Sequence, residues 1–144
     1  MIKKNNNKII LASDHAGFEL KEEIKKFLIK KNNSVVDLGT NDSNSVDYPD
    51  FAHKLSKKIN KNNYGILVCG SGIGMAMAAN KHKNIRAALC YSVISTKLSR
   101  KHNNANVMAL GARLTKKKLA LKCTDVFFKT KFESGRHLRR VKKI

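Results

Sequence analysis

Residues 65–81 read GILVCGSGIGMAMAANK, and this stretch indicates the fold most clearly. Gly65–Cys69 is a short continuous apolar run, which is typical of a strand that is buried on both faces. The glycine-rich turn Gly70–Gly74 follows it, and the small residues of Met75–Lys81 predict a helix. A buried strand that passes through a tight turn into a helix is the repeating unit of a parallel α/β sheet.

The same alternation of strand and helix runs through the rest of the chain. Apolar runs predict four further strands, at Lys8–Ala12, Ser34–Leu38, Ile85–Cys90 and Asn106–Leu110. Helical patterns occur at Glu19–Lys31, Ser92–His102, Lys116–Lys129 and in the tail Glu133–Ile144. A further helix is predicted after Asp50, which would be its N-cap, with Phe51, Leu55 and Ile59 on one side. In Ser92–His102, Ile94 and Leu98 are expected to face inward. The polar stretch 41–48, which ends before Pro49, is predicted as a loop. We therefore expect one three-layer α/β/α Rossmann-like domain over residues 1–144, with a five-stranded parallel sheet and a basic, Asn-rich extension at residues 1–7.

The charge of the chain invites a nucleic-acid-binding interpretation. Of its 144 residues, 30 are Lys or Arg and 10 are Asp or Glu, which gives a formal net charge of +20. However, Lys outnumbers Arg 24 to 6, Asn occurs 15 times and aromatic residues make up only 6%. Enrichment in Lys and Asn along a whole chain also follows from an AT-rich genome, and basic residues without interleaved aromatics suit single-strand binding poorly. We expect nucleic acid to bind at most non-specifically.

The composition also indicates the cellular compartment. Hydrophobic residues make up 42% of the chain, but no apolar run reaches the ~18 residues of a membrane helix. Met1–Lys8 lacks the apolar core of a signal peptide. The three cysteines, Cys69, Cys90 and Cys123, form no CxxC pair and fit a reducing compartment, with Cys90 and Cys123 as buried apolar residues. We expect a cytoplasmic protein without membrane contact.

Residues with chemical potential follow the predicted strands. Parallel strands end at one edge of a sheet, which is where ligands bind. The residues at these ends are Ser13–Gly17, Gly39 and Thr40, Cys69–Gly74, and, near the later elements, His102, Asn103, Gly111 and Arg113. His53 and His82 fall in polar, basic stretches and are given no role. No two histidines have the i, i+4 spacing of a metal site, so no metal is predicted.

Cys69 ends a strand beside the glycine turn. A helix N-terminus favours the thiolate form of a nearby cysteine, and Ser71 is placed to hydrogen-bond the sulfur or a substrate oxygen. The amides of the turn, with Gly70, Gly72 and Gly74, can point at a developing oxyanion. A thiolate base beside an oxyanion pocket suits removal of a proton next to a carbonyl group. A turn that needs glycine only for steric reasons fits the same pattern, and both interpretations stay open at this point.

Three further sets of polar residues also have two interpretations each. Asp14 and His15 can hold a hydroxyl group and an anion, or Asp14 can cap the helix that follows. His102 lies at a helix C-terminus, where a solvated imidazole is also favoured. Arg136 and Arg140 share a helical face and suit a phosphate, whereas a solvated basic tail is the alternative. Because three of the six arginines fall in this short tail, we favour the phosphate clamp.

Several ordered motifs together resemble type B ribose-5-phosphate isomerase. They are SDHAGFELK at 13–21, DYP at 47–49, CGSGIG at 69–74, ANK at 79–81, RA at 86–87, SRKHN at 99–103, NVMALGAR at 106–113 and GRH at 135–137. The resemblance extends over almost the whole chain, and the family includes relatives that act on allose 6-phosphate and galactose 6-phosphate. One branch of the family has Glu at the position of Met75 and Ser at that of Cys69, so this chain is similar to the Cys branch.

The resemblance implies an aldose–ketose isomerase that interconverts D-ribose 5-phosphate and D-ribulose 5-phosphate through an enediolate, in the non-oxidative pentose phosphate pathway. It implies no metal and no organic cofactor. Cys69 is implied as the base, with Ser71 assisting it, and Asp14 and His102 in ring opening. The implied substrate-binding residues are His15, Arg113, Arg136 and Arg140 for the phosphate, the amides of Gly70, Gly72 and Gly74 for the enediolate, and Tyr48, Asn103 and His137 for the sugar.

The resemblance also implies a homodimer or homotetramer with active sites shared between subunits, and a phosphate-binding tail at residues 133–144. Three alternatives remain. The first is an isomerase of a six-carbon aldose 6-phosphate, and the second is a basic nucleic-acid-binding module. The third is a phosphate- or nucleotide-binding regulator on a flavodoxin-like fold, which binds its ligand without turnover.

Overall fold

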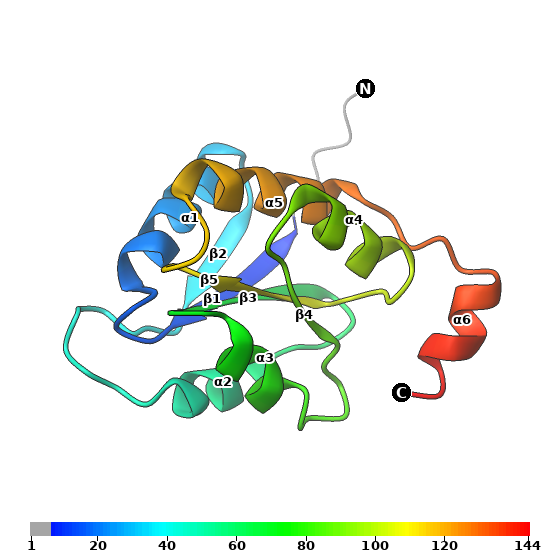
Figure 1. The fold of residues 1–144 in the computed structure, drawn as a ribbon, viewed down its shortest axis with the longest axis horizontal. Helices are drawn as coiled ribbons and strands as arrows, with labels where there is room; N and C mark the ends of the chain where they lie inside the picture. The colour runs from blue at the N-terminus through cyan, green and yellow to red at the C-terminus, as the bar shows by residue number, and fades with distance from the viewer. Residues whose placement is uncertain (1–6) are drawn as a thin grey trace.

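The computed structural model describes residues 7–144, so the predicted extension lies, apart from Asn7, outside the described residues. Within these residues, five parallel strands form one sheet in the order β2-β1-β3-β5-β4 (Figure 1). The strands are β1 (Lys8–Ser13), β2 (Ser34–Asp37), β3 (Asn63–Cys69), β4 (Ala87–Leu89) and β5 (Val107–Gly111). The predicted α/β class with a five-stranded parallel sheet is confirmed.

Helices cover both faces of the sheet. They are α1 (Phe18–Lys30), α2 (Tyr48–Ser56), α3 (Ile73–Ala79), α4 (Val93–Lys101), α5 (Lys117–Lys129) and the short α6 (Arg136–Val141). Figure 1 shows α1, α4 and α5 on one face and α2 and α3 on the other. Each face has its own apolar cluster, one including Ile24 and Phe127 and the other Leu55 and Met75, all fully buried. Burial of one such side chain contributes roughly 1.5–3 kcal/mol, so the apolar periodicity explains both layers.

The strand order places one crevice at the centre of the sheet. The chain runs from β1 outward to β2 and then crosses back to β3 on the other side of β1. Ser13 at the end of β1 is in register with Val68, one residue before Cys69 at the end of β3. Ligands of such sheets bind where the strand order reverses, outside the carboxyl ends of the strands. The fold therefore brings the Asp14 and Cys69 motifs together.

A buried ion pair holds the connection after β2 against this crevice. Lys21 is fully buried, and its Nζ lies 2.7 Å from Oδ2 of Asp37. The other carboxylate oxygen of Asp37 accepts a hydrogen bond of 2.9 Å from the Gly39 amide. The Gly39 carbonyl in turn accepts a hydrogen bond from the Ser13 amide at 2.8 Å. This chain of contacts fixes the backbone next to Asp14.

The predicted start of the second helix is wrong. Asp50 was expected as the N-cap after a loop that includes Tyr48, but α2 begins at Tyr48 with Asp47 as its N-cap residue. Pro49 lies in the first turn, where a missing amide proton costs no intrahelical hydrogen bond. As a result, Tyr48 is held on a helix at the rim of the crevice.

The predicted inward face of α4 is also wrong. Ile94 and Leu98 were expected to pack on the sheet, but they are 72% and 42% exposed. The buried residues of this helix are Thr96, Ser99 and Arg100. Their polar groups are satisfied, since the Thr96 hydroxyl donates to the Ser92 carbonyl and the Ser99 hydroxyl to the Thr96 carbonyl, each at 2.7 Å. An exposed apolar helix face marks an interaction surface.

Within residues 7–144, none of the helices has the length and apolar character needed to cross a bilayer.

Candidate active site

Cys69 ends β3 and is 4% exposed. Its Sγ accepts a hydrogen bond of 3.1 Å from the Gly72 amide. Gly72 has a φ of +77°, and a Cβ at this position would lie 2.8 Å from the carbonyl carbon of Leu110. A side chain is therefore excluded here for both conformational and steric reasons. The glycine turn therefore aims an N–H donor at the sulfur.

The turn after Cys69 is held from the side by the segment after β5. The Ala112 amide donates to the Cys69 carbonyl at 2.8 Å, and the Arg113 amide donates to the Gly70 carbonyl at 2.9 Å. The Ser71 hydroxyl accepts a hydrogen bond of 3.3 Å from the Ile73 amide. The sulfur therefore accepts its hydrogen bond from the Gly72 amide. The expectation that Ser71 would hydrogen-bond the sulfur is wrong. The other expectation, a bond from Ser71 to a substrate oxygen, stays a prediction.

Asp14 and His15 follow β1 and have fixed orientations. The Asp14 carboxylate, 6% exposed, accepts a hydrogen bond of 3.0 Å from the Gly17 amide. This bond closes the turn before α1, whose N-cap residue is Gly17. Nδ1 of His15 accepts a hydrogen bond of 3.1 Å from the Val46 amide. Because Nδ1 accepts, the proton of the neutral imidazole resides on Nε2.

Cys69, Ser71 and Asp14, but not His15, border an open cavity of about 500 Å³, which we name the Cys69 cavity. Its lining consists of Asp14, Tyr48, Cys69, Gly70, Ser71, Ile73, Gly74, Met77, Arg113 and Leu114. A Cβ built on Gly70 would lie 3.1 Å from a guanidinium nitrogen of Arg113, and one on Gly74 would lie 2.5 Å from the Tyr48 ring. Both glycines thus allow a cationic and an aromatic side chain to lie against the turn. The cavity offers a thiol, a carboxylate and a guanidinium within one space.

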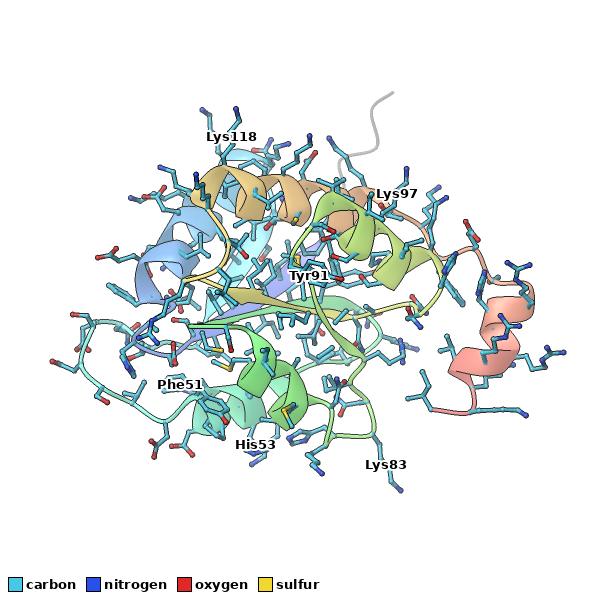
Figure 2. The ribbon with its side chains drawn as sticks, viewed as in Figure 1. Phe51, His53, Lys83, Tyr91, Lys97 and Lys118 are labelled. Carbon is cyan, nitrogen blue, oxygen red and sulfur yellow. The ribbon has the colours of Figure 1, made fainter. Side chains whose placement is uncertain are left out.

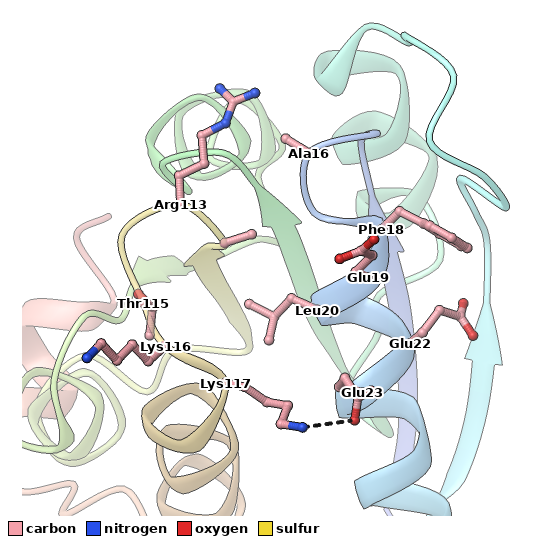
Figure 3. Close-up of a pocket in the computed structure, with 11 residues that line it drawn as sticks. Ala16, Phe18, Glu19, Leu20, Glu22, Glu23, Arg113, Thr115, Lys116 and Lys117 are labelled. Atoms are coloured by element: carbon pink, nitrogen blue, oxygen red, sulfur yellow. Dashed lines mark ion pairs between the residues drawn. The ribbon is translucent and has the colours of Figure 1, made fainter.

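A neighbouring cavity of about 570 Å³ lies between α1 and the segment after β5 (Figure 3). Glu19, Glu22 and Glu23 lie on its α1 side, and Glu23 is 3.9 Å from the Lys117 ammonium. Figure 3 shows the Arg113 guanidinium pointing away from these carboxylates. Arg113, Lys116 and Lys117 also line this cavity, so its three carboxylates are matched by three cationic side chains. Unlike the Cys69 cavity, it is not lined by a thiol.

A second group of predicted site residues lies at the end of α4 and on α6. The rings of His102 and His137 are stacked, with centroids 4.2 Å apart and planes 13° apart. The Glu133 carboxylate lies between Lys101, 3.1 Å away, and the two imidazoles. The hydrogen bond from Lys101 holds the pKa of Glu133 below its usual value, and desolvation together with neighbouring His102 lowers the pKa of His137.

This second group borders a cavity of about 360 Å³, which we name the His102 cavity. It is lined by His102, Asn103, His137, Arg140, Val141 and Ile144. The His102 cavity and the Cys69 cavity have no lining residue in common. Figure 1 shows α6 at the margin of the fold, beyond α4 and away from the sheet. A single chain therefore divides the predicted site into two parts.

Arg100 connects the elements around the His102 cavity. It is 6% exposed, and its guanidinium carbon lies 5.3 Å and 5.4 Å from the ring centroids of Tyr64 and Phe127. Its guanidinium donates hydrogen bonds to the Asn104 side chain and to the backbone carbonyls of Ala105 and Thr130. Burial lowers the pKa of Arg100. The residue fixes the end of α4 relative to the segment that leads to α6.

A model of the ribose/galactose isomerase family matches residues 9–144. The chain belongs to this family. It is 40% identical over 139 residues to ribose-5-phosphate isomerase B of Escherichia coli, which covers 95% of this chain and 93% of that protein. The structure of a ribose 5-phosphate isomerase from Thermotoga maritima aligns with a TM-score of 0.94 and 48% identity, over 96% of this chain and 97% of that one. The structure of ribose-5-phosphate isomerase B from Mycoplasma genitalium with bound ribulose-5-phosphate aligns with a TM-score of 0.92 and 44% identity, over 94% and 92% of the two chains.

Membership of the ribose/galactose isomerase family confirms the resemblance drawn from the motifs. Three residues that shape the site escaped the sequence analysis or received no role in it. Gly111 packs against the Ser71 backbone, Glu133 contacts both stacked histidines, and Arg100 is buried. The Glu133–His137 spacing of i, i+4 was the available signal for Glu133. His53 and His82, which had looked like separate surface residues, are paired through ring nitrogens 2.7 Å apart.

Lysines of this family member are spread over the surface. Figure 2 shows Lys83, Lys97 and Lys118 pointing outward from different sides of the molecule. A nucleic-acid-binding module concentrates its basic residues on one face. The distribution favours a compositional origin for most of the +20 charge.

Proposed function

We propose that the protein interconverts D-ribose 5-phosphate and D-ribulose 5-phosphate in the cytosol, as a step of the non-oxidative pentose phosphate pathway. One observation carries the proposal: the Cys69 thiol, with the Gly72 amide 3.1 Å from its sulfur, borders a cavity that also contains Asp14 and Arg113. The related Mycoplasma genitalium structure with bound ribulose-5-phosphate supports the choice of substrate. All three cysteines are free, which fits the reducing cytosol.

The proton transfer is assigned to the Cys69 cavity. The thiolate of Cys69 removes the proton from C2 of the open-chain aldose and returns it to C1, while a proton moves between the oxygens on these carbons. The amides of Gly70–Gly74 donate to the developing enediolate oxygen, where fixed donors stabilise charge most effectively. Ser71 assists at a substrate oxygen. The reaction moves only protons, so the proposal includes no metal and no organic cofactor.

Ring opening and phosphate binding involve both cavities. Asp14 accepts the proton of the C1 hydroxyl of the closed sugar, and His102 protonates the ring oxygen as it leaves. The phosphate is held by His15 and Arg113 from one part of the site and by Arg136 and Arg140 from the other. The sugar itself lies against Tyr48, Asn103 and His137.

Since one chain keeps the two cavities apart, we include a homodimer in the proposal. In a two-fold dimer, the Cys69 cavity of one copy faces the His102 cavity of the other, and two equivalent sites form. The exposed apolar side chains support such an interface. Ile73, Met77 and Leu114 at the rim of the Cys69 cavity are 49%, 68% and 72% exposed. Ile94 and Leu98 on α4, the helix that ends at His102, are also exposed.

The base is tested by comparing cysteine variants. Purified wild-type protein, Cys69→Ala and Cys90→Ala are incubated with ribose 5-phosphate and with allose 6-phosphate, with and without EDTA, and ketose formation is measured. Cys90 is a matched control, because burial raises the pKa of its thiol to about 11 and keeps it protonated. We expect Cys69→Ala to lose isomerisation and Cys90→Ala to retain it. Full activity of Cys69→Ala would show that Cys69 is not the base. Faster turnover of allose 6-phosphate than of ribose 5-phosphate would show that the proposed substrate is wrong.

The shared site is tested by mixing two impaired variants, Cys69→Ala and His102→Asn. Random exchange of subunits makes half of the dimers mixed, and each mixed dimer has one intact site. The mixture therefore recovers about a quarter of the wild-type activity if the sites are shared between subunits. A site contained within one chain gives no recovery on mixing.

A further inference from the structure

The cluster of His102, Glu133 and His137 has a second property that isomerisation does not use. Each residue offers one donor atom, and the three donor atoms lie within 4.8 Å of one another. Nε2 of His137 is 3.5 Å from Oε2 of Glu133, and Nε2 of His102 is 4.0 Å from the same oxygen. Two imidazoles and a carboxylate are a donor set that zinc and similar ions take in open, three-ligand sites.

The distances suit a tetrahedral ion. Two ligand atoms that are each about 2.1 Å from one tetrahedral Zn²⁺ lie about 3.4 Å apart. The His137–Glu133 pair, at 3.5 Å, already has this separation, and the His102–Glu133 pair, at 4.0 Å, needs only a small approach. Both imidazoles present Nε2 to the same carboxylate oxygen. Their rings are stacked with planes 13° apart, so one ring must rotate about χ2 before both in-plane lone pairs can point at one ion.

We propose that His102, Glu133 and His137 bind a divalent transition-metal ion of the Zn²⁺ class, and that the bound ion inhibits the isomerase. The inhibitory part rests on the proposed function, in which His102 protonates the ring oxygen. An ion bound to Nε2 of His102 occupies a lone pair of the imidazole that would otherwise carry a proton. Metal and sugar phosphate therefore compete for the His102 cavity.

The surrounding charges weaken this site. The Lys101 ammonium lies 3.1 Å from Glu133 and must yield part of its contact to the ion. Arg136 and Arg140 on α6 add positive charge near the cluster, and Arg140 lines the same cavity. These charges oppose a cation, so binding is reversible and easily removed by EDTA.

The experiment uses Co²⁺ as a spectroscopic probe, because tetrahedral Co²⁺ has intense visible d–d bands. The wild-type protein, freed of metal with EDTA, is titrated with CoCl₂, and the same is done for Glu133→Gln, Glu23→Gln and His82→Asn. Glu23→Gln is a matched exposed carboxylate, and His82→Asn removes the His53–His82 pair, the other close histidine pair in residues 7–144. Circular dichroism confirms that each variant is folded.

We expect tetrahedral bands in the wild type, Glu23→Gln and His82→Asn, and at least about tenfold weaker Co²⁺ binding in Glu133→Gln. We also expect Zn²⁺ to inhibit ribose 5-phosphate turnover less in Glu133→Gln than in the wild type, each relative to its own metal-free rate. Two results would refute the proposed metal site. The first is that the wild type shows no tetrahedral bands at millimolar Co²⁺. The second is that His82→Asn loses the bands while Glu133→Gln keeps them. The Co²⁺ bands do not depend on catalysis, so they test the metal site even if the protein does not isomerise ribose 5-phosphate. The turnover assay tests the isomerase activity separately.

Discussion

Gly111 offers a sharp test of how the turn after Cys69 is positioned. It ends β5, and a Cβ at this position would stand 2.5 Å from the carbonyl oxygen of Ser71 and 2.6 Å from its carbonyl carbon. Both atoms are backbone, so no side chain can rotate away. Restoring an ordinary contact requires the Ser71 peptide to move by about 0.5–1 Å.

The expected cost of Gly111→Ala follows from that displacement. The Ser71 peptide lies between Cys69 and Gly72, whose amide bonds the sulfur at 3.1 Å. A misplacement of about 1 Å at a reacting centre costs on the order of 10²-fold in rate. Overpacking in a well-packed region costs about 1–3 kcal/mol of stability. We therefore expect kcat for ribose 5-phosphate to fall by roughly 10–100-fold in a protein that remains folded.

The assay compares Gly111→Ala with Gly65→Ala, measuring kcat, KM and urea unfolding for both. Gly65 lies on the central strand β3, where the three atoms nearest to a Cβ belong to side chains, the first being Cδ2 of Leu55 at 2.7 Å. We expect Gly65→Ala to lower stability and to leave kcat near the wild-type value. If Gly111→Ala keeps a wild-type kcat, the geometry of this turn does not control the reaction.

Three further predictions concern binding, the buried arginine and acid stability. Arg136→Ala raises KM for ribose 5-phosphate more than it lowers kcat. Arg139→Ala, which changes a neighbouring exposed arginine, alters neither constant. If the two variants had the same effect on KM, Arg136 would have no specific contact with the phosphate. Arg100→Met leaves two backbone carbonyls and the Asn104 side chain without their donor, and it lowers the free energy of unfolding by about 3–5 kcal/mol in urea titrations. A loss below about 1 kcal/mol would contradict this role. Desolvation raises the pKa of Asp37, but hydrogen bonds from Lys21, Gly39 and Lys25 outweigh it and hold that pKa below the ordinary 3.8. The folded state therefore keeps this carboxylate ionised at lower pH than the unfolded state, and its stabilisation is present above about pH 4 and lost as pH falls below that. Asp37→Asn is accordingly less stable than the wild type at pH 7, and the difference narrows between pH 5 and pH 2; a constant difference would show that the charge is not involved.

Local patterns in the sequence were sufficient for the sheet and for one part of the site. Continuous apolar runs identify buried strands, and Cys69 with its glycine turn follows one of them, because strand, turn and helix are each specified by neighbouring residues. The ordered motifs were enough to identify the family. The catalytic role of Cys69 stays a prediction, while its position at the end of β3 is confirmed.

Other features depend on residues that are distant in the sequence. Ile94 and Leu98 have helical apolar spacing, but that spacing cannot tell whether the face meets the sheet of its own chain or another surface. Arg100 is buried because Tyr64 and Phe127, far away along the chain, supply aromatic faces for its guanidinium.

By itself, the sequence determined the α/β class, the family and the chemical groups available to the protein, because these are properties of local periodicity and of residue type. Only the tertiary structure decided that Asp14 joins Cys69 while His102 joins Glu133 and His137, in two cavities without a common residue. The physical reason is that strand order and the course of the tail set these distances, and both arise from contacts between residues that are far apart in the chain.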